Sequence, residues 1–132
     1  MKIALAQMNP HLGDFTANLE EMVSQAKQAK ESNCDLVVFP ELSLFGYHPC
    51  DLMERPGVID AQNSAVLERG KLLPSGIGCL VGVVTNHEGK GKTYLNSALL
   101  VVDGEIQKTF SKELLPVYDV FDDSRHFSAG SI

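Results

Sequence analysis

The chain has 132 residues, of which 44% are hydrophobic and 21% charged, so one domain or part of one is expected, with a moderate apolar core. Its formal net charge of -6, from 17 acidic and 11 basic side chains, gives no positive surface for a phosphate backbone and excludes nucleic acid as an expected partner. No apolar stretch reaches membrane-spanning length and the N-terminal one is too short for a signal peptide, so we expect a cytoplasmic protein without a membrane partner.

The three cysteines, Cys34, Cys50 and Cys79, are an odd number at wide spacings. Such a set fits neither a disulfide framework nor a CxxC metal site. We therefore expect a reducing compartment and no bound metal.

The first elements in chain order are a short strand and an amphipathic helix. Residues 2–8 are mostly apolar and end at Asn9-Pro10, which is typical of a buried strand. After a loop, apolar residues recur with the three- and four-residue spacing of one helix face, at Leu19, Met22, Val23, Ala26 and Ala29. Asp14 or Thr16 can cap this helix, and Asn33 can end it.

A second strand is predicted over residues 35–40, a continuous apolar run that is closed by Pro40. Strand, helix and strand together form a βαβ unit, in which the two strands are parallel and adjacent. The order of these elements predicts an α/β fold.

Residues 46–56 are rich in turn formers, so an irregular segment with one helical turn near Leu52 is expected. A second helix is predicted from residue 59 to about residue 72. Two alternative sets of apolar residues can face the core from it: Ile59, Val66 and Leu73, or Ala61, Ala65 and Leu72.

A third strand is predicted over residues 78–85, and two more β segments over 93–102 and 105–110. The last two flank Asp103-Gly104, a dipeptide that favours tight hairpin turns because both residues tolerate positive φ. We therefore expect an antiparallel hairpin to extend the sheet. The periodicity disappears from residue 111 to residue 132, where a loop is predicted.

Two charged residues follow predicted strands directly. Glu41 comes after Pro40, at the carboxyl end of a presumed parallel strand, where open α/β sheets build their ligand sites. Lys112 follows the β segment that ends at Phe110-Ser111. For each residue a solvated surface side chain is the alternative. Only a pairing of Glu41 with Lys112, on strands that could be neighbours, would favour catalysis.

Four stretches of the sequence resemble the carbon–nitrogen hydrolase, or nitrilase, superfamily. In chain order they are Gln7-Met8-Asn9-Pro10 with Gly13-Asp14 and Asn18, residues 38–47, Tyr94-Leu95-Asn96-Ser97-Ala98, and Lys112 with its loop. They span nearly the whole chain in the order that the family has. The resemblance implies an α/β, nitrilase-like α-β-β-α sandwich, of which residues 1–132 form the first half only.

Three details resemble the glutaminase domain of the glutamine-dependent NAD synthetases more than a free-standing amidase. They are Asn9-Pro10 with Gly13-Asp14, the run from Gly46-Tyr47 to Asp51-Leu52, and Lys112 with residues 115–127. The resemblance implies that L-glutamine is hydrolysed and that its ammonia passes to a synthetase domain for NAD synthesis. No cofactor is expected in this chain, and ATP and magnesium are expected only in a downstream synthetase domain.

The same resemblance implies a Glu, Lys, Cys triad that works through a thioester. Glu41 matches the base that takes the proton of the thiol, and Lys112 matches the cation that stabilises the oxyanion. Tyr118 matches a position that touches glutamine, although a tyrosine packed on its own loop is the alternative.

The expected nucleophile is missing from the sequence, because the family's cysteine lies beyond the loop and strand that follow Lys112. Cys34 and Cys79 are expected to be structural, and Cys50 follows Glu41 but lacks the nucleophile's context. His48, Cys50 and Asp123 stand where the family typically has proline, an acid and glutamate, so their roles stay open. We expect the chain alone to be inactive.

Other readings remain open. One is a free-standing amidase or nitrilase of the same superfamily, and another is a chain that keeps the fold and serves as a binding or structural subunit. Because half of a sandwich exposes an apolar face and an unpaired strand edge, we also expect a homo-oligomer.

Overall fold

The computed structural model describes residues 1–118 and 122–131, and its five strands form one sheet in the order β1-β2-β3-β4-β5. The strands are β1 (Ile3–Leu5), β2 (Leu36–Val38), β3 (Gly78–Asn86), β4 (Tyr94–Val102) and β5 (Glu105–Ser111). The first three are parallel and the last two join antiparallel, as predicted. Residues 119–121, within the segment that resembles the NAD synthetases, lie outside the described residues.

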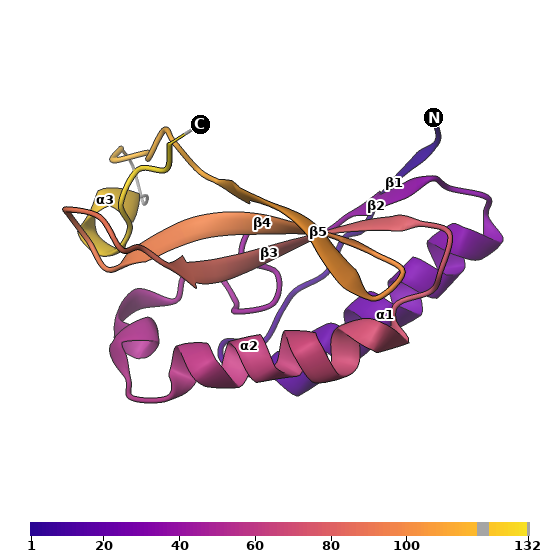
Figure 1. Cartoon of the computed structure of the whole chain (residues 1–132), viewed down its shortest axis with the longest axis horizontal. Coiled ribbons are helices and arrows are strands. Elements are labelled where there is room, and N and C mark those ends of the chain that lie inside the picture. The colour runs from indigo at the N-terminus through magenta and orange to yellow at the C-terminus, as the bar shows by residue number, and fades with distance from the viewer. Residues whose placement is uncertain (119–121, 132) are drawn as a thin grey trace.

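Two long helices, α1 (Phe15–Glu31) and α2 (Val58–Arg69), lie along the same face of the sheet (Figure 1). The short helices are η1 (Cys50–Glu54), η2 (Gly70–Leu72) and α3 (Asp123–His126). Asp14 caps α1, since its side chain accepts a 3.1 Å hydrogen bond from the N–H of Ala17. Asn33 has a φ of 58° just beyond the helix, where a residue in the left-handed region ends it.

The hydrophobic core lies between the helices and one face of the sheet. The apolar stripe of α1 packs there, with Leu19, Met22 and Ala26 no more than 2% exposed. From the α2 region, Ile59 and Leu73 are buried and Leu72 is 55% exposed, so the first of the two predicted sets faces the core. Each fully buried leucine, isoleucine or methionine side chain stabilises the fold by about 1.5–3 kcal/mol.

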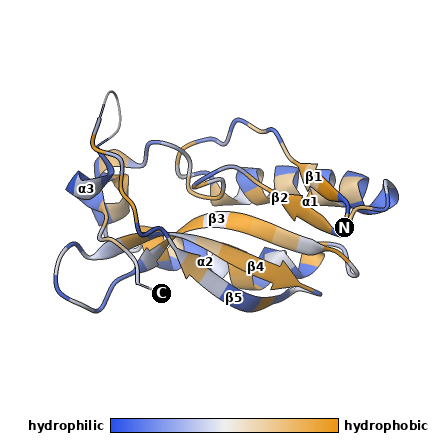
Figure 2. Cartoon of the chain, turned by 90° about the horizontal axis from the view of Figure 1, so that it is seen from above, coloured by the Kyte–Doolittle hydropathy of each residue, from blue (hydrophilic) through white to orange (hydrophobic). Residues whose placement is uncertain are grey.

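The opposite face of the sheet is also apolar and has no helix over it within the described residues. Figure 2 looks onto this face, where β1, β2, β3 and β4 are mostly coloured as hydrophobic and β5 is mostly coloured as hydrophilic. Alternation along the paired strands assigns to it Ile3, Leu5, Leu36, Val38, Leu80, Leu100 and Phe110. Leu5 is 76% exposed and Phe110 is 45% exposed. We name these seven residues the open face; together with the helical layer they make the predicted half of a sandwich.

The hairpin and the C-terminal segment test two further predictions. Asp103 and Gly104 have φ values of 51° and 78°, which confirms the predicted turn. The segment after residue 111 is not entirely loop, because α3 forms there. A four-residue helix is too short to leave a periodic signal, and α3 is held instead by Phe127, which is 4% exposed. No helix of the described ranges is both long and apolar enough to cross a membrane.

Candidate active site

The loop after β2 carries Glu41 and lies directly against β3. The N–H of Leu44 donates to the carbonyl of Gly82 at 2.9 Å, and the N–H of Gly82 donates to Oγ of Ser43 at 3.0 Å. A Cβ at Gly82 would lie 2.7 Å from the carbonyl oxygen of Pro40 and 2.9 Å from the nitrogen of Ser43. Only glycine allows this approach, which carries Glu41 from the end of β2 across β3.

Lys112 begins the segment after β5, and two backbone hydrogen bonds hold it in place. Its N–H donates to the carbonyl of Asn96 on β4 at 2.8 Å, and its own carbonyl accepts from the N–H of Gly130 at 2.8 Å. The sequence had allowed the strands that precede Glu41 and Lys112 to be neighbours. They are not neighbours, because β3 and β4 lie between β2 and β5. The crossing of β3 by the Glu41 loop closes this gap.

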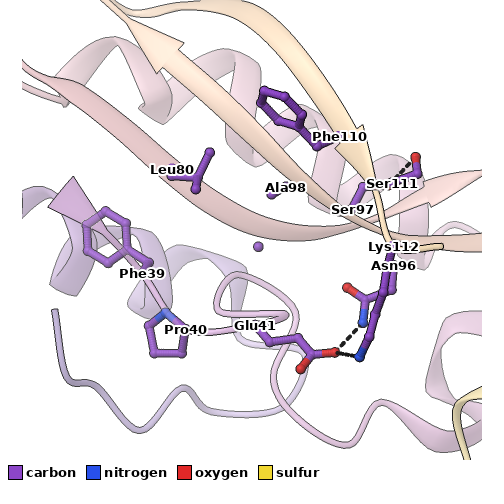
Figure 3. Close-up of a pocket in the computed structure, with 11 residues that line it drawn as sticks. Phe39, Pro40, Glu41, Leu80, Asn96, Ser97, Ala98, Phe110, Ser111 and Lys112 are labelled. Carbon is purple, nitrogen blue, oxygen red and sulfur yellow. Dashed lines mark hydrogen bonds and ion pairs between the residues drawn. The ribbon is translucent and has the colours of Figure 1, made fainter. Parts of the chain in front are cut away.

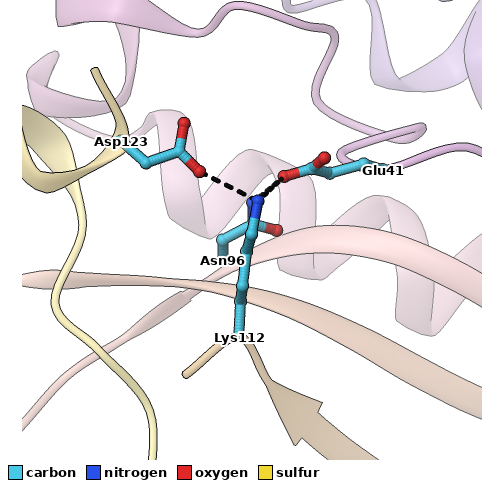
Figure 4. Close-up of polar contacts among 4 residues, drawn as sticks. All are labelled: Glu41, Asn96, Lys112 and Asp123. Atoms are coloured by element: carbon cyan, nitrogen blue, oxygen red, sulfur yellow. Dashed lines mark hydrogen bonds and ion pairs between the residues drawn. The ribbon is translucent and has the colours of Figure 1, made fainter. Parts of the chain in front are cut away.

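Glu41, Lys112, Asn96 and Asp123 form one polar cluster (Figure 4). Nζ of Lys112 donates to Oε1 of Glu41 at 2.7 Å and to Oδ2 of Asp123 at 3.0 Å. Nδ2 of Asn96 donates to the same Oε1 at 2.5 Å. The structure therefore brings together the two residues that the sequence proposed as base and cation, and adds two polar partners to them.

The charges of this cluster differ in their exposure to water. The side chain of Asp123 is 3% exposed, that of Lys112 is 30% and that of Glu41 is 43%. Burial by itself would lower the pKa of Lys112, but its hydrogen bonds and charge interactions with Glu41 and Asp123 outweigh burial and raise that pKa. Burial, followed by the charges of Asp123 and Glu41, raises the pKa of nearby Tyr47. Lys112 is therefore a cation at neutral pH.

A cavity of about 310 Å³ opens beside Glu41 and Lys112 (Figure 3). Its lining combines an apolar wall with the polar cluster, and comprises Phe39, Pro40, Glu41, Leu80, Gly82, Asn96, Ser97, Ala98, Phe110, Ser111 and Lys112. The volume is at the lower end of the range for small-molecule sites. A carboxylate and an ammonium at one end of an apolar cavity can polarise a small neutral substrate.

Tyr118, the predicted substrate-binding residue, is 68% exposed and is not among the described residues that line this cavity. Its role in binding glutamine stays a prediction. The residue lies in the segment between Lys112 and α3.

The cysteines lie away from the Glu41 cavity. Cys34 and Cys79 are buried, and burial raises the pKa of Cys79 to about 11, so its thiol stays neutral. Cys50 is exposed and lines a neighbouring cavity of about 200 Å³ together with His48 and Asp123. In the part of the chain that the structure describes, no three side chains of His, Cys, Asp or Glu are grouped to hold a metal ion.

Asn96 and Asp123 are the site residues whose roles the sequence did not reveal. Asn96 stands among apolar residues of a predicted strand, and it is 4% exposed. A buried amide in such a strand needs a hydrogen-bond partner, and that need was an available signal. The role of Asp123 was left open, and the structure pairs this residue with Lys112.

Comparisons with known proteins identify the family and the fold of the chain. The sequence profile of the carbon-nitrogen hydrolase family matches residues 2–129. The glutamine-dependent NAD(+) synthetase of Synechocystis is 41% identical over 98% of this chain and 24% of its own length. The chain thus spans about a quarter of that relative.

Two solved structures are similar to the fold. Glutamine-dependent NAD+ synthetase from Acinetobacter baumannii, solved with ADP, superposes with a TM-score of 0.87 at 38% identity, over 98% of this chain and 24% of its own. An amidase variant from Nesterenkonia, solved with butyramide, superposes with a TM-score of 0.78 at 26% identity, over 100% of this chain and 49% of its own. The chain corresponds to about half of the amidase.

Proposed function

Since the chain belongs to the carbon–nitrogen hydrolase family, we propose that residues 1–132 are the first part of a glutaminase domain that hydrolyses the amide of L-glutamine. The observation that carries the proposal is the 2.7 Å contact between Nζ of Lys112 and Oε1 of Glu41 at the mouth of a cavity. The 41% identity to a glutamine-dependent synthetase over 98% of the chain supports glutamine as the substrate.

In the proposed reaction Glu41 is the general base. Its carboxylate takes the proton of a cysteine thiol, and the thiolate forms a bond to the amide carbon of glutamine. The oxyanion that develops on the former carbonyl oxygen is stabilised by the Lys112 ammonium, which two carboxylates keep protonated and in place.

The same carboxyl group completes the cycle. When the tetrahedral intermediate collapses, the carbon–nitrogen bond breaks and the nitrogen leaves as ammonia with the proton that Glu41 holds. The resulting thioester is hydrolysed by water, whose proton Glu41 accepts and returns to the thiol. The products are glutamate and ammonia.

The proposal places the nucleophile outside these 132 residues. None of the three cysteines lines the cavity that holds Glu41 and Lys112, and two of them are buried in the core. The compartment that goes with this chemistry is the cytoplasm, in which thiols stay reduced.

For the parent protein we propose that the ammonia is used to make NAD, as the names of the relatives indicate. We expect neither ATP nor magnesium to bind within these 132 residues. Both would serve a separate synthetase domain.

A free-standing amidase is the second candidate function. It is favoured by the superposition on the Nesterenkonia amidase, of which the chain matches about half. A preference for short aliphatic amides over glutamine would select this alternative.

The proposal is tested by grafting the chain into the Synechocystis synthetase in place of its matching segment. The chimera should make NAD with glutamine as nitrogen source, and Glu41→Gln should abolish that activity but leave the activity with added ammonium. The 132-residue chain alone should release no ammonia from glutamine. A correctly folded chimera that uses ammonium and never glutamine, or glutamine hydrolysis by the isolated chain that Glu41→Ala abolishes, would overturn the proposal.

A further inference from the structure

Asn96 is buried in β4 and links Glu41 to Lys112 through two hydrogen bonds. Its side chain is joined to Glu41 through the 2.5 Å hydrogen bond from Nδ2, and its main-chain carbonyl accepts from the N–H of Lys112 at 2.8 Å. One residue thus contacts both the base and the cation. Glu41 and Lys112 themselves are 71 positions apart in the chain.

Both hydrogen bonds to the Glu41 carboxylate converge on one oxygen. Nδ2 of Asn96 and Nζ of Lys112 each donate to Oε1. An oxygen that accepts two hydrogen bonds has its lone pairs occupied and is fixed in position. The other oxygen, Oε2, is then the better acceptor for an incoming proton.

We propose that Asn96 is a positioning residue, which fixes Oε1 of Glu41 so that Oε2 receives the proton from the nucleophile. The source of that proton rests on the proposed function, whereas the fixing of Glu41 against Lys112 does not. Asn96 itself carries no proton in the reaction. Its amide is suited to the task because it donates without titrating.

A charged donor alone would leave Glu41 free to rotate. Lys112 divides its ammonium between Glu41 and Asp123, so it does not define the plane of the Glu41 carboxylate. The short side chain of Asn96, 4% exposed on a paired strand, has few conformations and supplies the second fixed point.

The test follows two nitrogen nuclei by NMR in the 132-residue chain, the side-chain amide nitrogen of Asn96 and the ammonium nitrogen of Lys112. Glu41→Gln should move the side-chain amide resonance of Asn96. Asn96→Ala should lower the pKa of Lys112 towards the ordinary lysine value, because Glu41 is no longer held beside the ammonium. Asn96→Leu retains roughly the size of the side chain, removes the donor and adds no charge. It should lower the Lys112 pKa as Asn96→Ala does, which separates the hydrogen bond from packing.

Gln62→Ala is the matched control, since Gln62 is 1% exposed and its amide bonds the backbone of Val84 on β3. It should lower stability and leave the Lys112 titration unchanged. In the chimera, Asn96→Ala should lower kcat roughly 10- to 100-fold with little change in KM. The proposal is overturned if the Lys112 pKa is the same in folded Asn96→Ala and wild-type chains, whatever the activity of the chimera.

Discussion

Lys112 and Asp123 form a 3.0 Å ion pair in which the carboxylate is 3% exposed and the ammonium 30% exposed. Water therefore reaches one partner and not the other. The Glu41 carboxylate on the other side of the same ammonium is 43% exposed and keeps much of its hydration. Loss of the contact with Asp123 should therefore lower the free energy of unfolding more than loss of the contact with Glu41.

Lys112→Met should lower the free energy of unfolding by about 1–3 kcal/mol, because the buried Asp123 carboxylate is left without its cation. Most of the loss should return in the double variant Lys112→Met with Asp123→Asn. Glu41→Gln should cost less than about 1 kcal/mol, as expected for an exposed pair. Urea unfolding of the four chains measures these differences, and an equal cost for Glu41→Gln and Lys112→Met would contradict the unequal burial.

Cys79 should make the fold less stable at alkaline pH. Burial raises its pKa from an ordinary 9.0 to about 11, so the unfolded chain loses the thiol proton first. Its stabilising contribution is complete below pH 9 and falls as the pH rises from 9 through 11, by roughly 2–3 kcal/mol in total. Unfolding curves of wild type and Cys79→Ala across this interval give the measurement, and parallel pH dependences in the two chains would refute the assignment.

Gly82→Ala should disrupt the loop that carries Glu41. Its new methyl group would overlap the Pro40 carbonyl and the backbone of the loop, so we expect a loss of about 1–3 kcal/mol. Gly70→Ala is the control, because nothing lies within 4 Å of a Cβ there and its φ is -59°. It should change stability by no more than about 0.5 kcal/mol. Thermal or urea unfolding would count against the crossing geometry if the two variants behaved alike.

The open face should cause the isolated chain to associate. Burying apolar surface between copies is favourable by about 25 cal/mol per Å², so dimers or larger species are expected at micromolar concentration. The double variant Leu5→Lys with Phe110→Lys should shift the chain towards monomer in sedimentation velocity. Leu67→Lys changes a 67% exposed leucine on α2 and should leave the distribution unaltered. Equal effects would show that the association does not use the open face.

Much of the fold was predictable because each element has its own local signal. The apolar stripe of α1, the cap at Asp14 and the Asp103-Gly104 turn depend on neighbouring residues, and the structure confirms all three. β1 is only three residues long, whereas a strand was predicted over residues 2–8. A strand ends where its partner ends, and β2 offers three pairing residues, which no pattern within residues 2–8 encodes.

The site was predictable only in part. Glu41 and Lys112 were identified through the resemblance and their places at strand ends, but the partner strands were not neighbours. The contact depends on the loop crossing β3 at Gly82, a tertiary feature without a local pattern. Asn96 and Asp123 were not identified for a similar reason. The role of a buried polar side chain depends on its hydrogen-bond partner, which the tertiary structure determines.

The Glu41–Lys112 contact spans 71 positions of the chain. It joins a βαβ unit to a hairpin, and each of these can gain structure from its own nearby contacts. Closing so long a segment costs conformational entropy, and contacts at such separation form slowly during folding. We therefore expect the Glu41–Lys112 contact to form late in the folding reaction. The time at which the Lys112 ammonium signal appears during refolding would mark the moment when the two halves of the sheet have docked.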